Sequence, residues 1–203
     1  MLNLYLVRHG ETLWNVEKRL QGFLDSDLTD LGVYQAKKLG ERLLDVDFSK
    51  VYASPSGRTQ KTAELVSRRT TADIINDSRI KEINFGSIEG RRTAKLPDDV
   101  KKQLDIMHEI PSEYDPSAYE GETYEDLFTR TDSFLNDVLK NDNGDVLVVA
   151  HGMSLMAMIA TIKKLKLNDF WIYGLKPNVS LTKYEYNDDN FKENLFYDIS
   201  HYE

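Results

Sequence analysis

Short, mostly apolar runs alternate along this chain with longer segments in which apolar residues recur at helical spacing. The runs at residues 2–7, 51–53, 73–75 and 146–150 predict four short strands. Residues 146–150 contain no polar position, which is typical of a parallel strand covered on both faces. The pattern therefore predicts a sheet whose strands are buried under helices on both sides.

The segments between these strands carry the periodicity of amphipathic helices. Thr29 precedes apolar residues that repeat at helical spacing to about Leu44, so we expect it to cap a helix. Further helices are predicted from Ser56 or Gly57 to about Arg69, and over residues 98–110, 122–140 and 153–166. Strands alternating with helices predict an α/β fold of three layers, α/β/α, with a mostly parallel central sheet.

Two parts of the chain depart from this alternation. Residues 179–186 and 191–199 flank a polar turn and predict a C-terminal antiparallel hairpin. Between residues 86 and 121 the pattern loses its regularity, and three prolines fall there. We expect a cap insertion at about 87–121, with one helix laid over the sheet edge and the active site. The whole chain, residues 1–203, is expected to form a single domain.

The chain is acidic and free of cysteine. It has 203 residues, 40% of them hydrophobic, and a net charge of −8 at pH 7. This charge argues against nucleic acid and anionic membranes as partners. The lack of cysteine excludes disulfides, thiolate zinc sites and thiol nucleophiles. The N-terminus lacks the features of a signal peptide, and the apolar stretch at 146–162 falls short of a membrane span, so we expect a soluble, cytoplasmic protein.

Two of the four histidines follow an apolar strand and precede a glycine. His9 stands between Arg8 and Gly10, and His151 comes directly before Gly152. Because the carboxyl ends of parallel strands share one edge of a sheet, both imidazoles are expected where open α/β folds build their sites. Arg8 offers a fork of donors that suits phosphate oxygens. His9 alone is open to several roles, as a nucleophile, a base, a metal ligand or a buried structural histidine.

Arg58 and Glu82 are further candidates at this edge. Arg58 lies in the first turn of a predicted helix, where free amides favour an anion and a cation disfavours the helix. An anionic partner therefore suits Arg58 better than the role of an ordinary surface arginine. Glu82 follows a strand end, where a carboxyl group can serve as a general acid, although its local pattern alone favours a solvated charge.

Together these residues supply two arginines, two histidines and one carboxylate. That combination suits phosphoryl transfer through a histidine. Metal-dependent hydrolysis fits less well, because the sequence has no HExxH motif, no cysteine and no acidic cluster beside the histidines. No metal site is therefore predicted.

Over nearly its full length the chain resembles the histidine phosphatase superfamily, in the branch that includes cofactor-dependent phosphoglycerate mutases and related small phosphatases. Five motifs stand in the family's order along the sequence. They are Arg8-His9-Gly10-Glu11-Thr12 with Trp14-Asn15, Ser54-Pro55 with Arg58-Thr59 and Ala63, Glu82 with Phe85-Gly86 and Glu89-Gly90, Gly121-Glu122-Thr123 with Arg130, and Ala150-His151-Gly152 with Ser154-Leu155.

The resemblance implies a phosphomonoester hydrolase that acts on small phosphorylated metabolites and needs neither a metal nor a cofactor. It implies that His9 is the nucleophile and becomes a phosphohistidine, while Glu82 protonates the leaving alcohol and then deprotonates the attacking water. Cationic groups around the phosphoryl oxygens stabilise the charge of the transition state. The catalytic residues so implied are His9, Glu82, His151, Arg8 and Arg58, and the implied phosphate-binding residues are Arg8, Asn15, Arg58, His151 and Gly152.

The same site can hydrolyse a phosphate ester or move phosphate between two hydroxyls. The resembling mutases carry a basic insertion with paired arginines that grip a carboxylate, whereas residues 102–119 here contain Glu109, Glu113 and Asp115 and no arginine. An acidic, partly apolar cover suits neutral or apolar leaving groups, so a phosphatase is favoured. The alternatives are a cofactor-dependent phosphoglycerate mutase and a non-catalytic binding member of the superfamily.

The substrate pocket is the part of the site that the motifs define least. We expect it to include Gln21, Gly22, Phe23 and Tyr119, although Phe23 and Tyr119 would equally pack against the insertion. Trp171 is expected to be a packing residue. An exposed edge of the terminal hairpin could pair with a second copy, whereas polar residues such as Lys183 and Glu185 could instead protect it, so both a monomer and a homodimer stay open.

Overall fold

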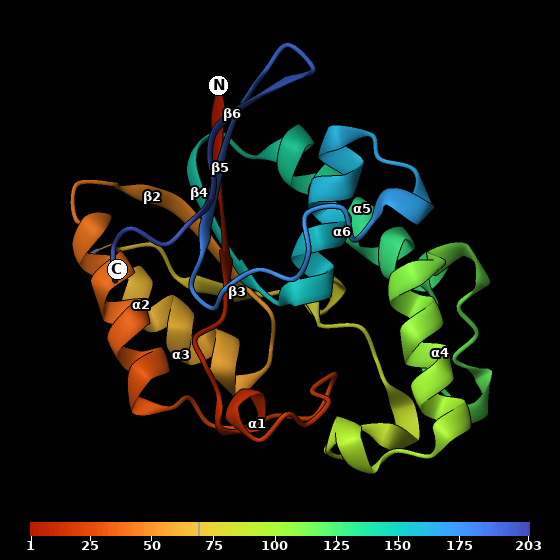
Figure 1. Ribbon diagram of the computed structural model, residues 1–203. Coiled ribbons are helices and arrows are strands. Elements are labelled where there is room, and N and C mark those ends of the chain that lie inside the picture. Colours follow the sequence, from red (N-terminus) through yellow and green to blue (C-terminus); the bar gives the residue numbers. More distant parts are fainter. Residues whose placement is uncertain (69) are drawn as a thin grey trace.

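Residues 1–68 and 70–203 are described by a computed structural model, in which a six-stranded sheet runs through the centre (Figure 1). The strand order is β3-β2-β4-β1-β5-β6. The strands are β1 (Leu2–Arg8), β2 (Phe48–Ala53), β3 (Ile74–Asn76), β4 (Gly144–Ala150), β5 (Leu181–Asn187) and β6 (Asn190–Asp198). The first four are mutually parallel, and β5 and β6 add an antiparallel hairpin beside β1. The predicted fold class and hairpin are confirmed.

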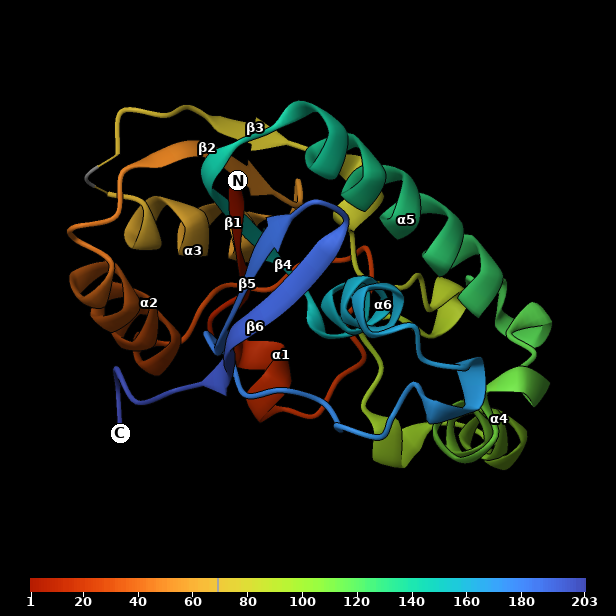
Figure 2. The same cartoon turned by 90° about the horizontal axis from the view of Figure 1, so that it is seen from above.

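Helices cover both faces of this sheet, as the view from above in Figure 2 shows. On one face lie α2 and α3, and on the other lie α5 and α6. The helices are α1 (Leu13–Val16), α2 (Asp30–Arg42), α3 (Gly57–Val66), α4 (Asp98–Glu109), α5 (Tyr124–Asn141) and α6 (Gly152–Lys163). The described residues also form the 3₁₀ turns η1 (Ser78–Ile80), η2 (Gly86–Ile88), η3 (Thr93–Lys95), η4 (Pro111–Glu113), η5 (Ser117–Tyr119) and η6 (Leu167–Asp169).

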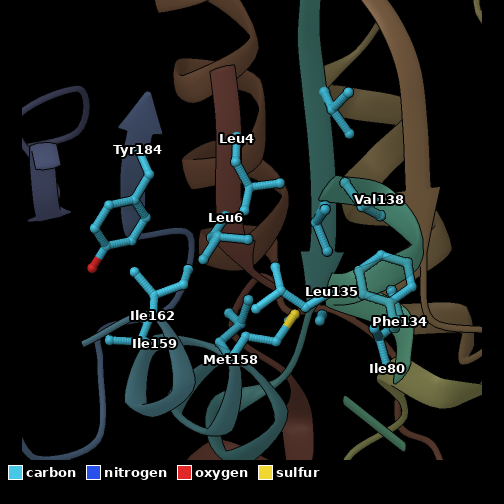
Figure 3. Close-up of a cluster of buried hydrophobic side chains, with 14 of the residues drawn as sticks. Leu4, Leu6, Ile80, Phe134, Leu135, Val138, Met158, Ile159, Ile162 and Tyr184 are labelled. Carbon is cyan, nitrogen blue, oxygen red and sulfur yellow. The ribbon is translucent and has the colours of Figure 1, made fainter. Parts of the chain in front are cut away.

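Alternate residues of β1 enter two different cores. Leu4 and Leu6 pack with α5 and α6 (Figure 3), whereas Tyr5 and Val7 pack with α2 and α3. This is the period-two alternation of a strand with helices on both faces. Each fully buried aliphatic side chain contributes about 1.5–3 kcal/mol relative to an exposed one, so the two cores hold the sheet edge rigidly in place.

Local caps decide where the helices begin and end. The side chain of Thr29 accepts a hydrogen bond from the Gly32 N–H at 3.0 Å, so the predicted cap of α2 is confirmed. The helix predicted from residue 122 begins two residues later, because Thr123 and Asp126 form a capping box.

Two helices end earlier than their periodicity predicts. α6 ends at Lys163 rather than at residue 166, because Lys164 takes a left-handed conformation with a φ of 54°. α3 is described to Val66, and its predicted end near Arg69 lies outside the described residues.

The segment between residues 86 and 121 consists of α4 and short turns, and α4 matches the predicted helix closely. Its buried residues Val100 and Met107 share a core with Met153 and Met156 of α6. The segment therefore covers the first turn of α6, which directly follows β4. Among the described helices, none has the length and apolar character to cross a membrane.

Candidate active site

The carboxyl ends of β1, β2 and β4 bring distant parts of the sequence together. The backbone N–H of His9 donates to the carbonyl oxygen of Ala150 at 3.0 Å, and that of Ser54 donates to Val149 at 3.1 Å. The imidazole rings of His9 and His151 lie 5.3 Å apart between their centroids. Both histidines thus stand at the carboxyl edge of the parallel strands.

His9 is held in one tautomer by its neighbour. Its Nδ1 lies 2.8 Å from the carbonyl oxygen of Gly10, and because a carbonyl only accepts, Nδ1 carries the proton. The lone pair therefore resides on Nε2. Burial holds the pKa of His9 well below its usual 6.5, and the charges of Arg58 and Arg8 lower it further. A neutral imidazole with this lone pair can act as a nucleophile.

Gly10 fixes the turn that follows His9. A Cβ at Gly10 would lie 2.8 Å from the carbonyl oxygen of Gly32, so only glycine permits this approach to α2. The N–H of Gly10 also donates to Thr62 Oγ1 at 3.0 Å. The backbone that presents His9 is therefore packed against both α2 and α3.

Arg8 lines a cavity beside His9. Its side chain is buried, Nη1 donates to the carbonyl oxygen of Lys176, and Nε has no partner among the described residues. Buried donors are almost always paired in proteins. A guanidinium with an unpaired donor at the cavity wall suits an anionic ligand.

Arg58 is 1% exposed, so it is not an ordinary surface arginine. Its Nη1 donates to the carbonyl oxygen of Leu24 at 2.9 Å and to Asp25 Oδ1 at 2.8 Å, and Nη2 donates to Gly22 O at 2.9 Å. The guanidinium is not part of the cavity lining. It lies behind the wall, where it fixes the loop at residues 22–25 and keeps its positive charge close enough to lower the pKa of His9.

His151 and Gly152 do not line the cavity themselves, but they adjoin His9 and Glu82, which do. His151 is 1% exposed, its Nε2 lies 2.8 Å from Ser54 Oγ, and its Nδ1 has no partner within the described ranges. Burial first, and the charge of Arg58 second, hold the pKa of His151 well below 6.5. A Cβ at Gly152 would lie 2.4 Å from Leu175 Cδ1, so a larger residue here would require the exposed Leu175 side chain to move.

Glu82 is buried, contrary to the solvated charge that its local pattern favours. Its Oε1 accepts from the N–H groups of Ile83 and Met153 at 3.0 Å and of Ser154 at 3.3 Å. Burial raises the pKa of Glu82, while these hydrogen bonds and the two nearby arginines oppose the rise without reversing it. A raised pKa makes this carboxyl group a better candidate for giving and taking a proton than an exposed glutamate would be. The prediction that Glu82 directly follows a strand is wrong, because η1 stands between it and β3.

The sequence analysis missed how Glu82 is held. Arg130 of α5 donates from Nη2 to the carbonyl oxygen of Glu82 at 3.0 Å and from Nη1 to that of Lys81 at 2.6 Å. Arg130 also pairs with Glu122, whose Oε2 accepts from the Asn84 N–H at 3.0 Å. The fourth motif therefore positions the carboxyl-bearing segment and does not reach the cavity.

Asn15 and Gln21 line the cavity and are joined through Thr12. The Thr12 N–H donates to Asn15 Oδ1 at 3.1 Å, and the Thr12 hydroxyl donates to Gln21 Oε1 at 2.9 Å. Both side-chain oxygens thus face the protein, which leaves the amide nitrogens as donors.

The remaining pocket residues lie outside the cavity lining. The Gly22 carbonyl is bound to Arg58, and Phe23 is half exposed, with the Lys81 ammonium 3.5 Å from its ring centroid. Tyr119 is 1% exposed and donates its hydroxyl to that of Tyr114 at 2.9 Å. None of these three expected pocket residues lines the cavity.

The cavity itself has a volume of about 390 Å³ and extends from His9 to α4. Its wall is formed by Arg8, His9, Asn15, Arg19, Leu20, Gln21, Glu82, Phe85, Thr93, Lys101, Leu104, Asp105, Met107, His108, Met153, Trp171 and Leu175. Polar groups converge at the His9 end, and apolar side chains make up most of the wall beyond it. Such a shape fits a ligand with a charged head and an apolar body.

Trp171 is expected to be a packing residue, and in the structure it also lines the cavity. Its Nε1 donates to the Met107 carbonyl and to the Tyr124 hydroxyl, both at 2.8 Å. The His108 ring lies over it at 4.1 Å between centroids, with a tilt of 32°. A flat surface that is held in this way suits an aromatic group. No pattern local to Trp171 reveals it, because its partners lie on α4 and α5.

No group of three or more His, Cys, Asp or Glu side chains that could hold a metal ion occurs within residues 1–68 and 70–203. The arginine and lysine side chains that line the cavity are Arg8, Arg19 and Lys101.

Known proteins resemble this chain in sequence and in fold. Residues 4–199 match the family model of the histidine phosphatase superfamily (branch 1). A probable phosphoglycerate mutase GpmB of Enterobacter sp. (strain 638) is 37% identical over 163 residues, which cover 80% of this chain and 75% of that protein.

Two solved structures show the same fold across the whole chain. Bacillus stearothermophilus YhfR has a TM-score of 0.94 and 33% identity, and the match covers 100% of both chains. A phosphoserine phosphatase variant from Entamoeba histolytica, solved with phosphoserine, has a TM-score of 0.81 and 25% identity, again with 100% of both chains covered. The chain belongs to branch 1 of the histidine phosphatase superfamily.

Proposed function

We propose that the chain is a metal-independent phosphomonoester hydrolase that acts on small phosphorylated metabolites through a phosphohistidine at His9. The observation that carries the proposal is the hydrogen bond from His9 Nδ1 to Gly10 O, which leaves a lone pair on Nε2 in a site lined by Arg8. The low pKa of His9 keeps this nitrogen unprotonated at neutral pH.

In the first step, His9 Nε2 attacks phosphorus and the bond to the leaving oxygen breaks. That oxygen takes the proton of the Glu82 carboxyl group and departs as an alcohol. Charge on the phosphoryl oxygens grows as the bond breaks, and the guanidinium of Arg8 with the positive field of Arg58 opposes it. The donors of Asn15, His151 and the Gly152 N–H complete the set that we assign to the phosphoryl group.

In the second step, water attacks the phosphohistidine. The Glu82 carboxylate takes a proton from this water, the bond between phosphorus and Nε2 breaks, and inorganic phosphate leaves. His9 and Glu82 return to their starting states, so the cycle consumes one ester and one water. No cofactor enters this scheme.

The apolar part of the cavity supports a hydrolase whose leaving group has an apolar body. Leu104, Met107 and Trp171 line this part, and its basic groups already have partners. Arg19 pairs with Glu17, and Lys101 pairs with Asp98. The phosphoserine phosphatase among the similar structures supports hydrolysis as well.

A phosphoglycerate mutase is the second candidate, and the GpmB relatives favour it by name. A mutase must hold a second phosphate acceptor while it keeps water from the phosphohistidine. The partly apolar wall favours the hydrolase, and the full set of His9, Glu82 and Arg8 at one cavity argues against a non-catalytic member.

The test is steady-state turnover of p-nitrophenyl phosphate and 3-phosphoglycerate in parallel, with a chelator present, using His9→Ala as the control. We expect phosphate release that survives the chelator and falls by several orders of magnitude in His9→Ala. Near-normal turnover of His9→Ala would overturn the proposal. Formation of 2-phosphoglycerate without phosphate release, only after bisphosphoglycerate is added, would establish the mutase.

A further inference from the structure

The connection from α6 to β5 returns to the active site (Figure 1), where residues 175–179 form a strap across the end of β1. The carbonyl oxygen of Lys176 accepts from Arg8 Nη1. The Val179 N–H donates to the Arg8 carbonyl oxygen at 3.1 Å. The Asn178 side chain donates from Nδ2 to the His9 carbonyl oxygen at 2.9 Å. The strap thus binds the two residues that line the cavity at the end of β1.

Asn178 reaches a third residue of the site. Its Nδ2 lies 3.4 Å from Oδ1 of Asn15, which already accepts from the Thr12 N–H at 3.1 Å. A backbone N–H can only donate, so the Asn15 atom that faces Thr12 must be the oxygen. The same argument applied to the His9 carbonyl identifies the Asn178 atom as nitrogen. Backbone partners therefore determine the orientation of both amides.

These contacts direct the donor end of Asn15. With Oδ1 held by two donors, the Nδ2 group is left for the cavity, which Asn15 lines. We propose that Asn178 is a positioning residue of the phosphoryl site, which keeps Nδ2 of Asn15 turned towards the substrate and the His9 backbone in register with it. This role rests on the proposed function, because it gives Asn15 a phosphoryl oxygen to bind.

The strap is itself held firmly. The Tyr202 hydroxyl donates to the Asn178 carbonyl oxygen at 2.7 Å. Val179, which is fully buried, has a φ of 55°, a conformation that a β-branched residue adopts only when its surroundings impose it. The backbone on either side of the Asn178 side chain is thus fixed, as a positioning role requires.

The test is a double-mutant cycle between Asn178→Ala and Asn15→Ala, read as kcat/KM for p-nitrophenyl phosphate. We expect Asn178→Ala to lower kcat/KM about 10-fold in the native background, the effect of one hydrogen bond of about 1.4 kcal/mol. In the Asn15→Ala background the same change is expected to lower it less than about 3-fold. The proposal is overturned if Asn178→Ala lowers kcat/KM by factors that agree within about 3-fold in the two backgrounds. It is also overturned if the variant shows no loss in the native background.

Two further variants separate positioning from folding. Asn194→Ala removes an exposed asparagine of β6 and is expected to leave kcat/KM unchanged. If Asn178→Ala does not fold, Tyr202→Phe removes the hydroxyl that holds the Asn178 carbonyl. It is expected to lower kcat/KM about 3-fold in the native background and not in Asn15→Ala. Equal losses in both backgrounds overturn the role again.

A binding readout distinguishes failure of this role from failure of the proposed function. The same cycle is measured as the Kd of inorganic phosphate by calorimetry, which needs no turnover. If the native chain hydrolyses no ester, the proposed function fails, and a coupled change in phosphate Kd still supports the role of Asn178. If the native chain turns over and both cycles are additive, only the positioning role fails.

Discussion

The backbone N–H of Met153 donates to both carboxylate oxygens of Glu82, at 3.0 and 3.2 Å. The proposed acid therefore sits on the first turn of α6, the helix that His151 caps. The helix terminus favours the carboxylate, whereas burial favours the protonated acid, and burial prevails. The N-terminus of α6 thus holds the Glu82 carboxyl group close to His151, which we assign to the phosphoryl group.

Replacement of Glu82 by glutamine should lower kcat/KM by an amount that depends on the leaving group of the substrate. An alkyl phosphate needs a proton on its departing oxygen, whereas p-nitrophenolate leaves without one. We expect Glu82→Gln to lower kcat/KM about 10²- to 10⁴-fold for an alkyl phosphate and far less for p-nitrophenyl phosphate. Equal losses on both substrates would contradict the assigned role.

The raised pKa of Glu82 also predicts the alkaline limb of the pH profile. The acid must be protonated, so kcat/KM for an alkyl phosphate falls as the pH rises through the pKa of Glu82, which lies above 4.5. His9 must be neutral, and its lowered pKa moves the acidic limb below 6.5. A profile of kcat/KM against pH checks both limbs, and Glu82→Gln should lack the alkaline one.

Arg130 affects catalysis only through the segment that carries Glu82. Arg130→Met leaves the Glu122 carboxylate and the Glu82 carbonyl without their donor, and we expect it to lower the free energy of unfolding by about 3 kcal/mol. Because Glu82 then loses its position, turnover of an alkyl phosphate should fall more than that of p-nitrophenyl phosphate. Denaturant unfolding and kinetics on both substrates measure this. The control Lys61→Met, which breaks an exposed pair with Glu64, should change stability by less than about 1 kcal/mol.

The residues that sequence analysis placed most directly are those at strand ends. His9 and His151 each follow an apolar strand, and the parallel pairing of β1 with β4 brings them together. Each strand end can be recognised from the local sequence, and residues at the carboxyl ends of parallel strands lie at the same edge of the sheet. The same reasoning places Arg58, whose helix begins where β2 ends.

Other parts of the site depend on contacts between distant segments. The local pattern around Glu82 favours a solvated side chain, whereas contacts with Arg130 and with the first turn of α6 hold it inside the protein. Trp171 faces the cavity because α4 folds back over α6, which no periodicity predicts. Tyr119 looks equally suited to the pocket, but the insertion packs it against Tyr114. Tertiary packing decides these positions, so a single sequence does not reveal them.

Trp171 should decide how well the cavity distinguishes aromatic from small leaving groups. We expect Trp171→Leu to lower the ratio of kcat/KM for phenyl phosphate to that for methyl phosphate by about 2- to 10-fold, equivalent to about 0.5–1.5 kcal/mol for an aromatic pair. Inhibition by inorganic phosphate, which reaches only the His9 end, should not change. A variant that loses activity equally on both esters would contradict a leaving-group role for this wall.

His201 should make the stability of the fold sensitive to acid without involving the active site. Burial lowers the pKa of His201 from 6.5 to about 4. The unfolded chain therefore binds a proton near pH 6.5 that the folded chain takes up only near pH 4, so stability falls as the pH falls through this window and levels off below it. Each such proton contributes up to about 1.4 kcal/mol per pH unit. His201→Gln should reduce this slope between pH 6.5 and 4 in denaturant unfolding, measured against pH 8, where the histidine is neutral in both states. An unchanged slope would show that His201 is protonated equally in the folded and unfolded chains.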